Sequence, residues 1–225
     1  MSSGFNLDLI RDEYDSKKKT MQTYLDDIRT IIVNSNSCLE GNCFYYHQTL
    51  ELFNDLFSKQ LNLFWCGKQG ITRMCEIGFN AGHSTMLMLL GRETTPIEFT
   101  IFDIGHHAYT RPCVDYIKDT FQHVQFEYVE GDSTVIMPLW IDAHQDVVNT
   151  YDVVHVDGGH SEHCISNDMK NADRLVKKGG VVIVDDTNDA IINQYVDFYL
   201  MNGKYVEVRL LPSYGYPHRI IRKID

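Results

Sequence analysis

Residues 71–84 have the sequence ITRMCEIGFNAGHS, and this stretch decides the fold class. A short β-rich run ends near Ile77, and an apolar run typical of a helix begins at Ser84. Gly78 and Gly82 lie between the two runs, where they permit a tight turn and a close approach of the backbone to a ligand. The stretch therefore predicts a strand, a nucleotide-binding type of turn and a helix, in that order.

Downstream of this stretch, β-rich runs alternate with helical ones. The further runs are IEFTIFDI, VQFEYVEGD, YDVVHVDGG, GVVIVDD, YVEVRLLP and HRIIRKI. Alternating strands and helices predict a parallel sheet with helices on both faces. Only residues 213–217 separate the last two runs, so those two are expected to pair as an antiparallel hairpin. We therefore predict an α/β fold with a Rossmann-like, seven-stranded, mostly parallel sheet whose last strand is antiparallel.

The N-terminal third has a different rhythm. Residues 5–35 and 44–65 carry apolar side chains at three- and four-residue spacings, which predicts two helices. No repeat or low-complexity linker separates them from the β-rich part. We expect residues 1–70 to form a helical cover, packed on a single catalytic core of residues 71–225.

Composition excludes several classes of protein. Lys and Arg number 20 against 31 Asp and Glu, so the net charge is −11. Proteins that grip phosphate backbones depend on Lys and Arg, so nucleic acid is not expected as a partner. The sequence contains neither a long apolar span nor a signal-peptide pattern, so we expect a soluble, cytoplasmic protein without a membrane partner. The six cysteines form no C-x-x-C pair, which argues against a zinc knuckle.

Acidic residues gather where the predicted strands end. In open parallel sheets ligands bind beyond the carboxyl ends of the strands. Glu76 precedes the glycine turn and disfavours a pyrophosphate, so a cationic ligand without phosphate suits the turn better. Asp103 ends the second strand, where a carboxylate can accept hydrogen bonds from ribose hydroxyls, and Asp132 and Ser133 follow the third strand, within reach of an adenine. Alone, Asp103 is equally well explained as a turn or helix-capping residue.

The ordered set MCEIGFNAGHS, IFDI and VEGDS resembles the class I S-adenosylmethionine-dependent methyltransferases. The segment from HVDGGH to VVIVDDT is similar to the small-molecule O-methyltransferases related to the catechol, caffeoyl-CoA and macrolide-sugar enzymes. The resemblance implies S-adenosylmethionine as the cofactor. The residues expected to bind it are Glu76, Gly78, Asn80, Gly82, Ser84, Asp103, Asp132, Ser133 and Asp157.

The resemblance also implies a divalent cation, held by Asp157 after the fourth strand and by Asp185 and Asp186 after the fifth. Carboxylates that converge on neighbouring strand ends repel one another unless a cation neutralises them. Oxygen ligands favour a hard cation, with Mg²⁺ first and Mn²⁺ or Ca²⁺ as alternatives. The competing interpretation is an acidic rim in which Asp185 and Asp186 merely cap the next helix.

His160 follows Asp157 at the position from which catechol-type relatives present a lysine base and sugar-type relatives a histidine. A neutral imidazole can accept a hydroxyl proton near neutral pH. We therefore expect His160, with Asp157, to be catalytic and the acceptor to be a small-molecule or sugar hydroxyl. The alternative is a loop histidine that caps the helix at 161–175. Relatives of this kind are often dimers, so a homodimer is possible.

Two other functions compete with this interpretation. A nicotinamide-dependent oxidoreductase would share the doubly wound sheet, but the sequence lacks G-x-G-x-x-G and carries Asp185-Asp186 after the fifth strand. A non-catalytic cofactor-binding protein would keep the cofactor turn but would not need Asp157 or His160 for its effect. Substrate identity is outside the reach of these motifs. The acceptor pocket is expected from the N-terminal helices, the region near Trp140 and residues 214–216.

Overall fold

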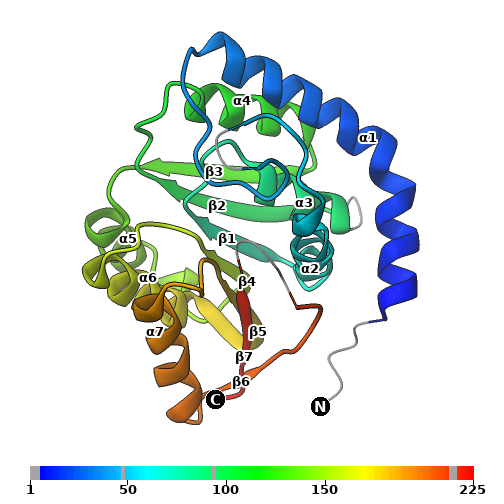
Figure 1. The fold of residues 1–225 in the computed structure, drawn as a ribbon. Helices are drawn as coiled ribbons and strands as arrows, with labels where there is room; N and C mark the ends of the chain where they lie inside the picture. The colour runs from blue at the N-terminus through cyan, green and yellow to red at the C-terminus, as the bar shows by residue number, and fades with distance from the viewer. Residues whose placement is uncertain (1–5, 47–48, 93–94, 213–216) are drawn as a thin grey trace.

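A computed structural model describes residues 6–46, 49–92, 95–212 and 217–225. Seven strands of this part form one mixed sheet in the order β3-β2-β1-β4-β5-β7-β6 (Figure 1). The strand β7 is antiparallel to both of its neighbours, and the other pairings are parallel. The predicted fold class is confirmed. The strands are β1 (Arg73–Ile77), β2 (Ile97–Asp103), β3 (Val124–Glu130), β4 (Tyr151–Val156), β5 (Val176–Val184), β6 (Tyr205–Glu207) and β7 (Arg219–Lys223).

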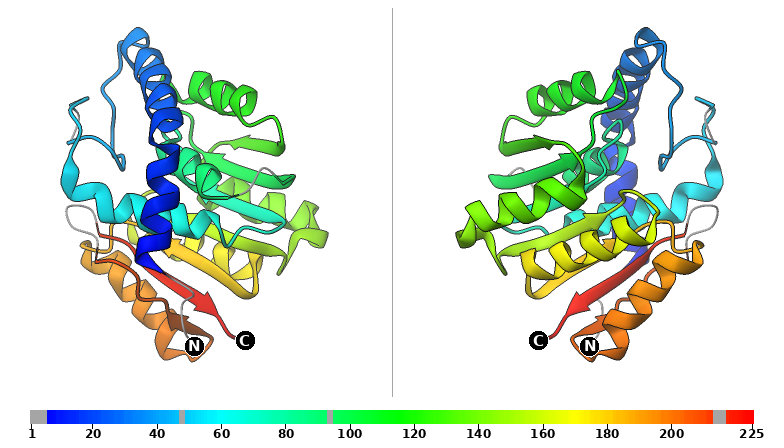
Figure 2. Two further views of the ribbon diagram at one scale, coloured as in Figure 1. Left: turned by 90° about the vertical axis from the view of Figure 1, so that its right-hand side faces the viewer. Right: turned by 90° about the vertical axis from the view of Figure 1, so that its left-hand side faces the viewer.

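Helices cover both faces of this sheet (Figure 2). Successive strand residues point to opposite faces, so each strand feeds two separate apolar cores. One core joins the sheet to α1 (Leu7–Asn34), α2 (Phe57–Gly67), α3 (His83–Gly91) and α4 (Thr110–Thr120). The other core joins it to α5 (Ser133–Ala143), α6 (Glu162–Leu175) and α7 (Ala190–Met201). The N-terminal segment therefore belongs to the same core as the sheet, and within it α1 contacts α2, α3 and α4.

The predicted helix at 44–65 is wrong in its first half. A short 3₁₀ turn at Asn54–Leu56 leads into α2, and the described residues at 44–46 and 49–53 form no helix but contain an isolated bridge between Tyr45 and Leu52. The side chain of Asn42 accepts hydrogen bonds from the backbone N–H groups of Phe44 and Tyr45, which turns the chain locally. The aromatic rings here are buried by tertiary contacts, so their helical spacing was misleading.

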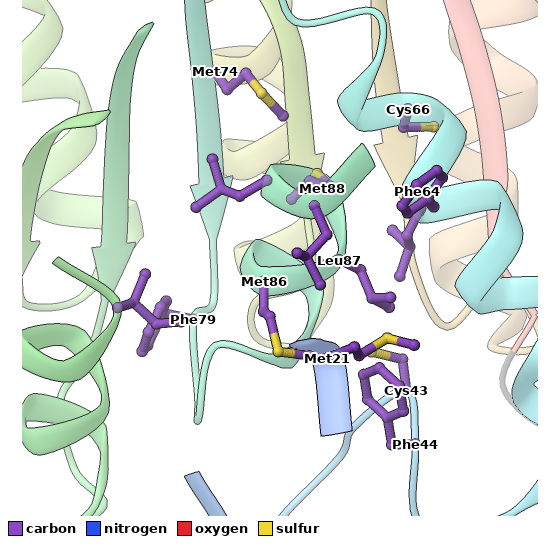
Figure 3. Packing of buried hydrophobic residues seen from close by; sticks show 14 of the residues in the cluster. Met21, Cys43, Phe44, Phe64, Cys66, Met74, Phe79, Met86, Leu87 and Met88 are labelled. Carbon is purple, nitrogen blue, oxygen red and sulfur yellow. The ribbon is translucent and has the colours of Figure 1, made fainter. Parts of the chain in front are cut away.

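The helices α2 and α3 cross with their backbones in contact. A side chain at Gly67 would place its Cβ 1.9 Å from the carbonyl oxygen of Met88, and one at Gly91 would place it 1.9 Å from that of Phe64. Figure 3 shows side chains of both helices in one cluster with Cys43 and Phe44 of the preceding segment. The two glycines therefore set how closely α2 approaches α3.

Among the residues that the structure describes, no helix is both long and apolar enough to cross a membrane.

Candidate active site

The turn after β1 requires glycine at two places. Gly78 has a φ of +88°, and a Cβ there would lie 2.0 Å from the carbonyl oxygen of Asp157. Gly82 has a φ of +79° and precedes the first residue of α3. Positive φ angles are readily adopted only by glycine. The turn can therefore bring the ends of β1 and β4 against each other without side chains between them.

A cavity of about 920 Å³ opens at the carboxyl edge of the sheet. Its wall is formed by the turn after β1, the ends of β2 to β5 and residues 40–43 of the N-terminal segment. Most of the predicted site residues line it: Gly78, Asn80, Ser84, Asp103, Asp132, Ser133, Asp157, His160, Asp185 and Asp186. Glu76 and Gly82 are not among the residues that line this cavity.

Glu76 lies below the cavity rather than in its wall, contrary to the expectation that it faces a ligand. Its carboxylate is fully buried and accepts hydrogen bonds from the hydroxyls of Ser84 (2.5 Å) and Thr85. His155, its neighbour in register on β4, contacts it through Nδ1 at 2.8 Å. Burial alone would lower the pKa of His155, but its bond to Glu76 outweighs that effect and raises the pKa. Strand geometry gives the reason, since Glu76 points to the sheet face that α3 covers.

The carboxylate of Asp103 binds the backbone of the turn that follows β1. One carboxylate oxygen accepts hydrogen bonds from the N–H groups of Phe79 (2.7 Å) and Asn80 (2.9 Å), and the other accepts from Gly105 (2.7 Å). Asp132 caps α5 by accepting from the N–H and hydroxyl of Thr134, and these bonds lower its pKa. Both carboxylates are thus stabilised by neutral hydrogen-bond donors. Their contacts to ribose and adenine stay predictions.

Asn80 links the cofactor turn to the N-terminal segment. Its Nδ2 donates to the carbonyl oxygens of Gly41 (2.6 Å) and Glu40 (3.2 Å), and its Oδ1 accepts from the hydroxyl of Tyr109 (2.6 Å). The Tyr109 hydroxyl in turn accepts from the N–H of Glu40. Asn80 was expected to bind the cofactor, and since it lines the cavity this stays a prediction. Its side chain fastens residues 40–41 to the edge of the cavity.

A lysine that the motifs did not point to lies beside the predicted metal ligands. Lys59 of α2 is 4% exposed, and its Nζ is 2.5 Å from the Oδ2 of Asp185. Burial would lower its pKa, but Asp185 and Asp157 outweigh burial and raise the pKa. The same contact keeps the pKa of Asp185 low despite burial, whereas burial and the charge of Asp185 hold the pKa of Asp157 above its usual range.

His160 and Asp186 form a second pair in the cavity wall, in addition to Lys59 and Asp185. The Nε2 of His160 is 2.9 Å from the Oδ2 of Asp186, and this hydrogen bond raises the pKa of the imidazole. The simpler interpretations of these residues fail. The side chain that caps α6 is Ser161, and the one that caps α7 is Asp189. His160, Asp185 and Asp186 therefore do not act as the caps of the helices that follow them.

The residues present do not fit a divalent cation as they are arranged. Among the described residues, two groups of side-chain atoms lie close enough together to share an ion, one from Glu40, His106 and His107 and one from His155, Asp157 and Asp185. In the second group, Glu76 engages only the Nδ1 of His155, whose buried Nε2 has no hydrogen-bond partner, and Lys59 engages Asp185. Asp186 lies outside this group and pairs with His160. A metal ion at these carboxylates would have to displace a buried ammonium group. Of the three predicted ligands, Asp157 and Asp185 come together and Asp186 does not, and because Lys59 already pairs with Asp185 this arrangement does not favour the predicted magnesium site.

Sequence reasoning missed Lys59, the pairing of His155 with Glu76, and residues 40–43. One signal was available for Lys59, because it is a charged residue inside the otherwise apolar helix FSKQLNLFWCG. His155 was interpreted only as a packed strand residue. Aligning the ends of β1 and β4 would have placed it opposite Glu76.

Comparison with known proteins agrees with this geometry. A family model described as a methyltransferase domain matches residues 75–187, half of the chain. The O-methyltransferase TomG of Streptomyces achromogenes, in complex with S-adenosylmethionine, is 15% identical, with a TM-score of 0.58 over 74% of this chain and 80% of that one. An O-methyltransferase from Bacillus cereus with bound S-adenosylhomocysteine is 13% identical, with a TM-score of 0.60 over 90% of this chain and 91% of that one.

No curated protein matches the sequence significantly. At identities this low the solved structures show the fold, and the family model shows the family. The resemblance inferred from the motifs is thereby confirmed. The chain belongs to the methyltransferase domain family, and its fold is that of the class I S-adenosylmethionine-dependent methyltransferases.

Proposed function

We propose that this protein transfers the methyl group of S-adenosylmethionine to a hydroxyl oxygen of a small molecule. The observation that carries the proposal is a single cavity, lined by the glycine turn after β1, by Asp103, and by the His160–Asp186 pair. A cofactor turn and a base at one cavity are what methyl transfer to oxygen requires. The solved structures of similar fold that hold S-adenosylmethionine or its product support the choice of cofactor.

The cofactor fits this cavity in one direction. Its adenosine would lie toward Asp103, Asp132 and Ser133, which belong to the ends of β2 and β3. Its methionine part would lie toward Gly78, Ser84 and Asp157. An acidic lining favours a sulfonium cation, because opposite charges attract strongly in a partly desolvated site.

The chemistry then depends on His160. When the neutral ring donates its Nε2 proton to Asp186, its Nδ1 is the basic nitrogen. Nδ1 removes the proton of the acceptor hydroxyl as the oxygen attacks the methyl carbon. The oxygen–carbon bond forms while the carbon–sulfur bond breaks, and S-adenosylhomocysteine leaves with the electron pair on sulfur. The protein contributes by aligning the three reacting atoms.

The acceptor side of the cavity is formed in part by the N-terminal segment. Residues 40–43 and Leu63 line it, which supports the proposal that residues 1–70 act as a cover for the core of residues 71–225. Trp140 does not line it, since this residue lies on α5 and donates its indole N–H to Glu127. Residues 214–216, which were also expected at the pocket, lie outside the described residues. A sugar hydroxyl and a homodimer stay predictions.

Calorimetry tests the cofactor. We expect S-adenosylmethionine and S-adenosylhomocysteine to bind and NAD not to bind. Binding of NAD in their place would overturn the proposal in favour of an oxidoreductase. A mass-spectrometric screen of sugar nucleotides, glycans and phenols would then identify the acceptor by the added mass of one methylene.

Two variants separate an enzyme from a protein that only binds the cofactor. His160→Gln should lower kcat by about 10²–10⁴-fold while the affinity for S-adenosylhomocysteine is kept. The matched control is His163→Gln, because His163 is exposed on the first turn of α6 and does not line the cavity. Equal turnover in both variants would contradict the role of His160.

A further inference from the structure

The ammonium group of Lys59 lies among the carboxylates at the carboxyl edge of the sheet, beside Asp185 and Asp157. Its side chain and that of Asp185 are 5% and 4% exposed, and both residues line the cavity together with Asp157. An isolated buried ammonium or carboxylate is very costly, so the two groups stabilise each other. Lys59 reaches this place because α2 packs tightly against α3 through Gly67 and Gly91.

Basic side chains as well as carboxylates lie around Lys59. Three carboxylates lie in or next to this buried centre, from Glu76, Asp157 and Asp185, and the cations facing them are Lys59 and His155. His218 also lies near Asp185, but burial lowers its pKa to about 3 and leaves it neutral. Burial raises the pKa of the Cys43 thiol, so this neighbour is neutral as well.

The contact that bears on a metal ion is the one between Lys59 and Asp185, whose Nζ and Oδ2 are 2.5 Å apart in the cavity wall beside Asp157. A divalent cation would add two more positive charges beside Lys59, and repulsion between them would oppose its binding.

We propose that the ammonium group of Lys59 is the resident cation of this active site and takes the place of a divalent metal ion, so that the enzyme works without one. The part of this inference that concerns catalysis rests on the proposed function. The part that concerns cation binding rests only on the contacts of Lys59, Asp157 and Asp185.

The ammonium group can serve the reaction as a fixed positive charge. Lysine carries a compact charge, and Asp185 holds it in place at the cavity wall. As His160 takes the proton, negative charge grows on the acceptor oxygen, and a preorganised cation beside the cavity stabilises that charge. Asp157 and Asp185 would then position the cation of the site rather than ligate a metal.

The first test uses the unmodified protein. Electron paramagnetic resonance of Mn²⁺ should show no binding at millimolar concentration, and turnover should be unchanged by EDTA. Tight Mn²⁺ binding together with loss of turnover in EDTA would overturn the inference. This measurement does not depend on the folding of any variant.

The second test removes the ammonium group. Lys59→Met leaves Asp157 and Asp185 without their cation, so we expect this variant to gain Mn²⁺ binding and to lose about 10²–10³-fold in turnover in EDTA. The double variant Lys59→Met/Asp185→Asn removes the charge on both sides and should bind no Mn²⁺. If folded Lys59→Met binds no Mn²⁺, Lys59 does not hold the place of a metal.

Lys68→Met is the matched control, since Lys68 directly follows α2 and pairs with Glu13 at the surface. It should match the unmodified protein in turnover and in its lack of Mn²⁺ binding. Binding of S-adenosylhomocysteine, measured on the same samples, separates the two claims. Its absence would refute the proposed function, whereas Mn²⁺ binding by the unmodified protein would refute the role of Lys59.

Discussion

The acidic edge of the sheet has two halves that stabilise their carboxylates by different means. In the central half, at β1, β4 and β5, Glu76 and Asp185 contact the side chains of His155 and Lys59. In the outer half, at β2 and β3, Asp103 and Asp132 accept hydrogen bonds from nearby backbone N–H groups and a hydroxyl. The outer carboxylates therefore depend on neutral hydrogen-bond donors, most of them backbone N–H groups, and the central ones depend on basic side chains.

The comparison predicts the largest loss of stability in the central half. Glu76→Ala leaves the buried imidazolium of His155 and two hydroxyls without their acceptor, so the free energy of unfolding should fall by about 3–5 kcal/mol. Urea unfolding of the variant and the unmodified protein measures this difference in the free energy of unfolding. The control is Glu98→Ala, which breaks an exposed ion pair with Arg73 and should cost about 0–1 kcal/mol. Equal losses in the two variants would remove the distinction between the halves.

Asp168 differs from the carboxylates of both halves, because its buried oxygens have neither an ion pair nor a hydrogen-bond partner among the described residues. This carboxyl on α6 is 1% exposed, and burial raises its pKa from 3.8 to about 6, against a smaller opposing effect of Ser133. Its folded pKa lies above its unfolded one, so it is the protonated form that the fold favours, and stability is lost as the pH rises through both values.

Asp168→Asn should therefore increase the free energy of unfolding by about 2–3 kcal/mol above pH 7 and by little near pH 4. Thermal unfolding of both proteins across this range provides the measurement. A stability difference that is the same at every pH would show that the carboxyl is already compensated.

In the outer half, Asp103→Asn is expected to act on the cofactor more than on the fold. The amide places an N–H group against the backbone donors of Phe79, Asn80 or Gly105, which disturbs the turn. The affinity for S-adenosylhomocysteine should fall by about 10–100-fold, or about 1.4–2.8 kcal/mol, in calorimetry. An unchanged affinity would mean that the turn does not need this carboxylate.

The smallest expected effect is at Asp132. Asp132→Ala removes the cap of α5 and should lower the free energy of unfolding by about 1 kcal/mol. Asp132→Asn keeps a capping side chain and should change it by only a few tenths of that value. Chemical unfolding of the two variants side by side tests this, and equal losses would assign the effect to the charge rather than to the cap.

The same division explains what the sequence could predict. The strand, turn and helix at residues 71–84 were predictable because Gly78 and Gly82 act through local backbone geometry. The His160–Asp186 pair was only half predictable, since His160 was identified as a base without its partner Asp186. Lys59 was missed because its partner follows a strand far along the chain. The helix expected at 44–65 was wrong in its first half because the apolar spacing there reflects tertiary packing.

The close crossing of α2 and α3 has an evolutionary consequence. Because Gly67 and Gly91 have no side chains, α2 lies deep enough for Lys59 to reach Asp185. A single mutation of either glycine to a larger residue would push α2 outward and withdraw the ammonium group while every residue of the cavity wall stays the same. Under the proposed role of Lys59, the two glycine positions are therefore expected to be constrained together with the lysine. Comparing these two positions with position 59 across homologues would test this expectation.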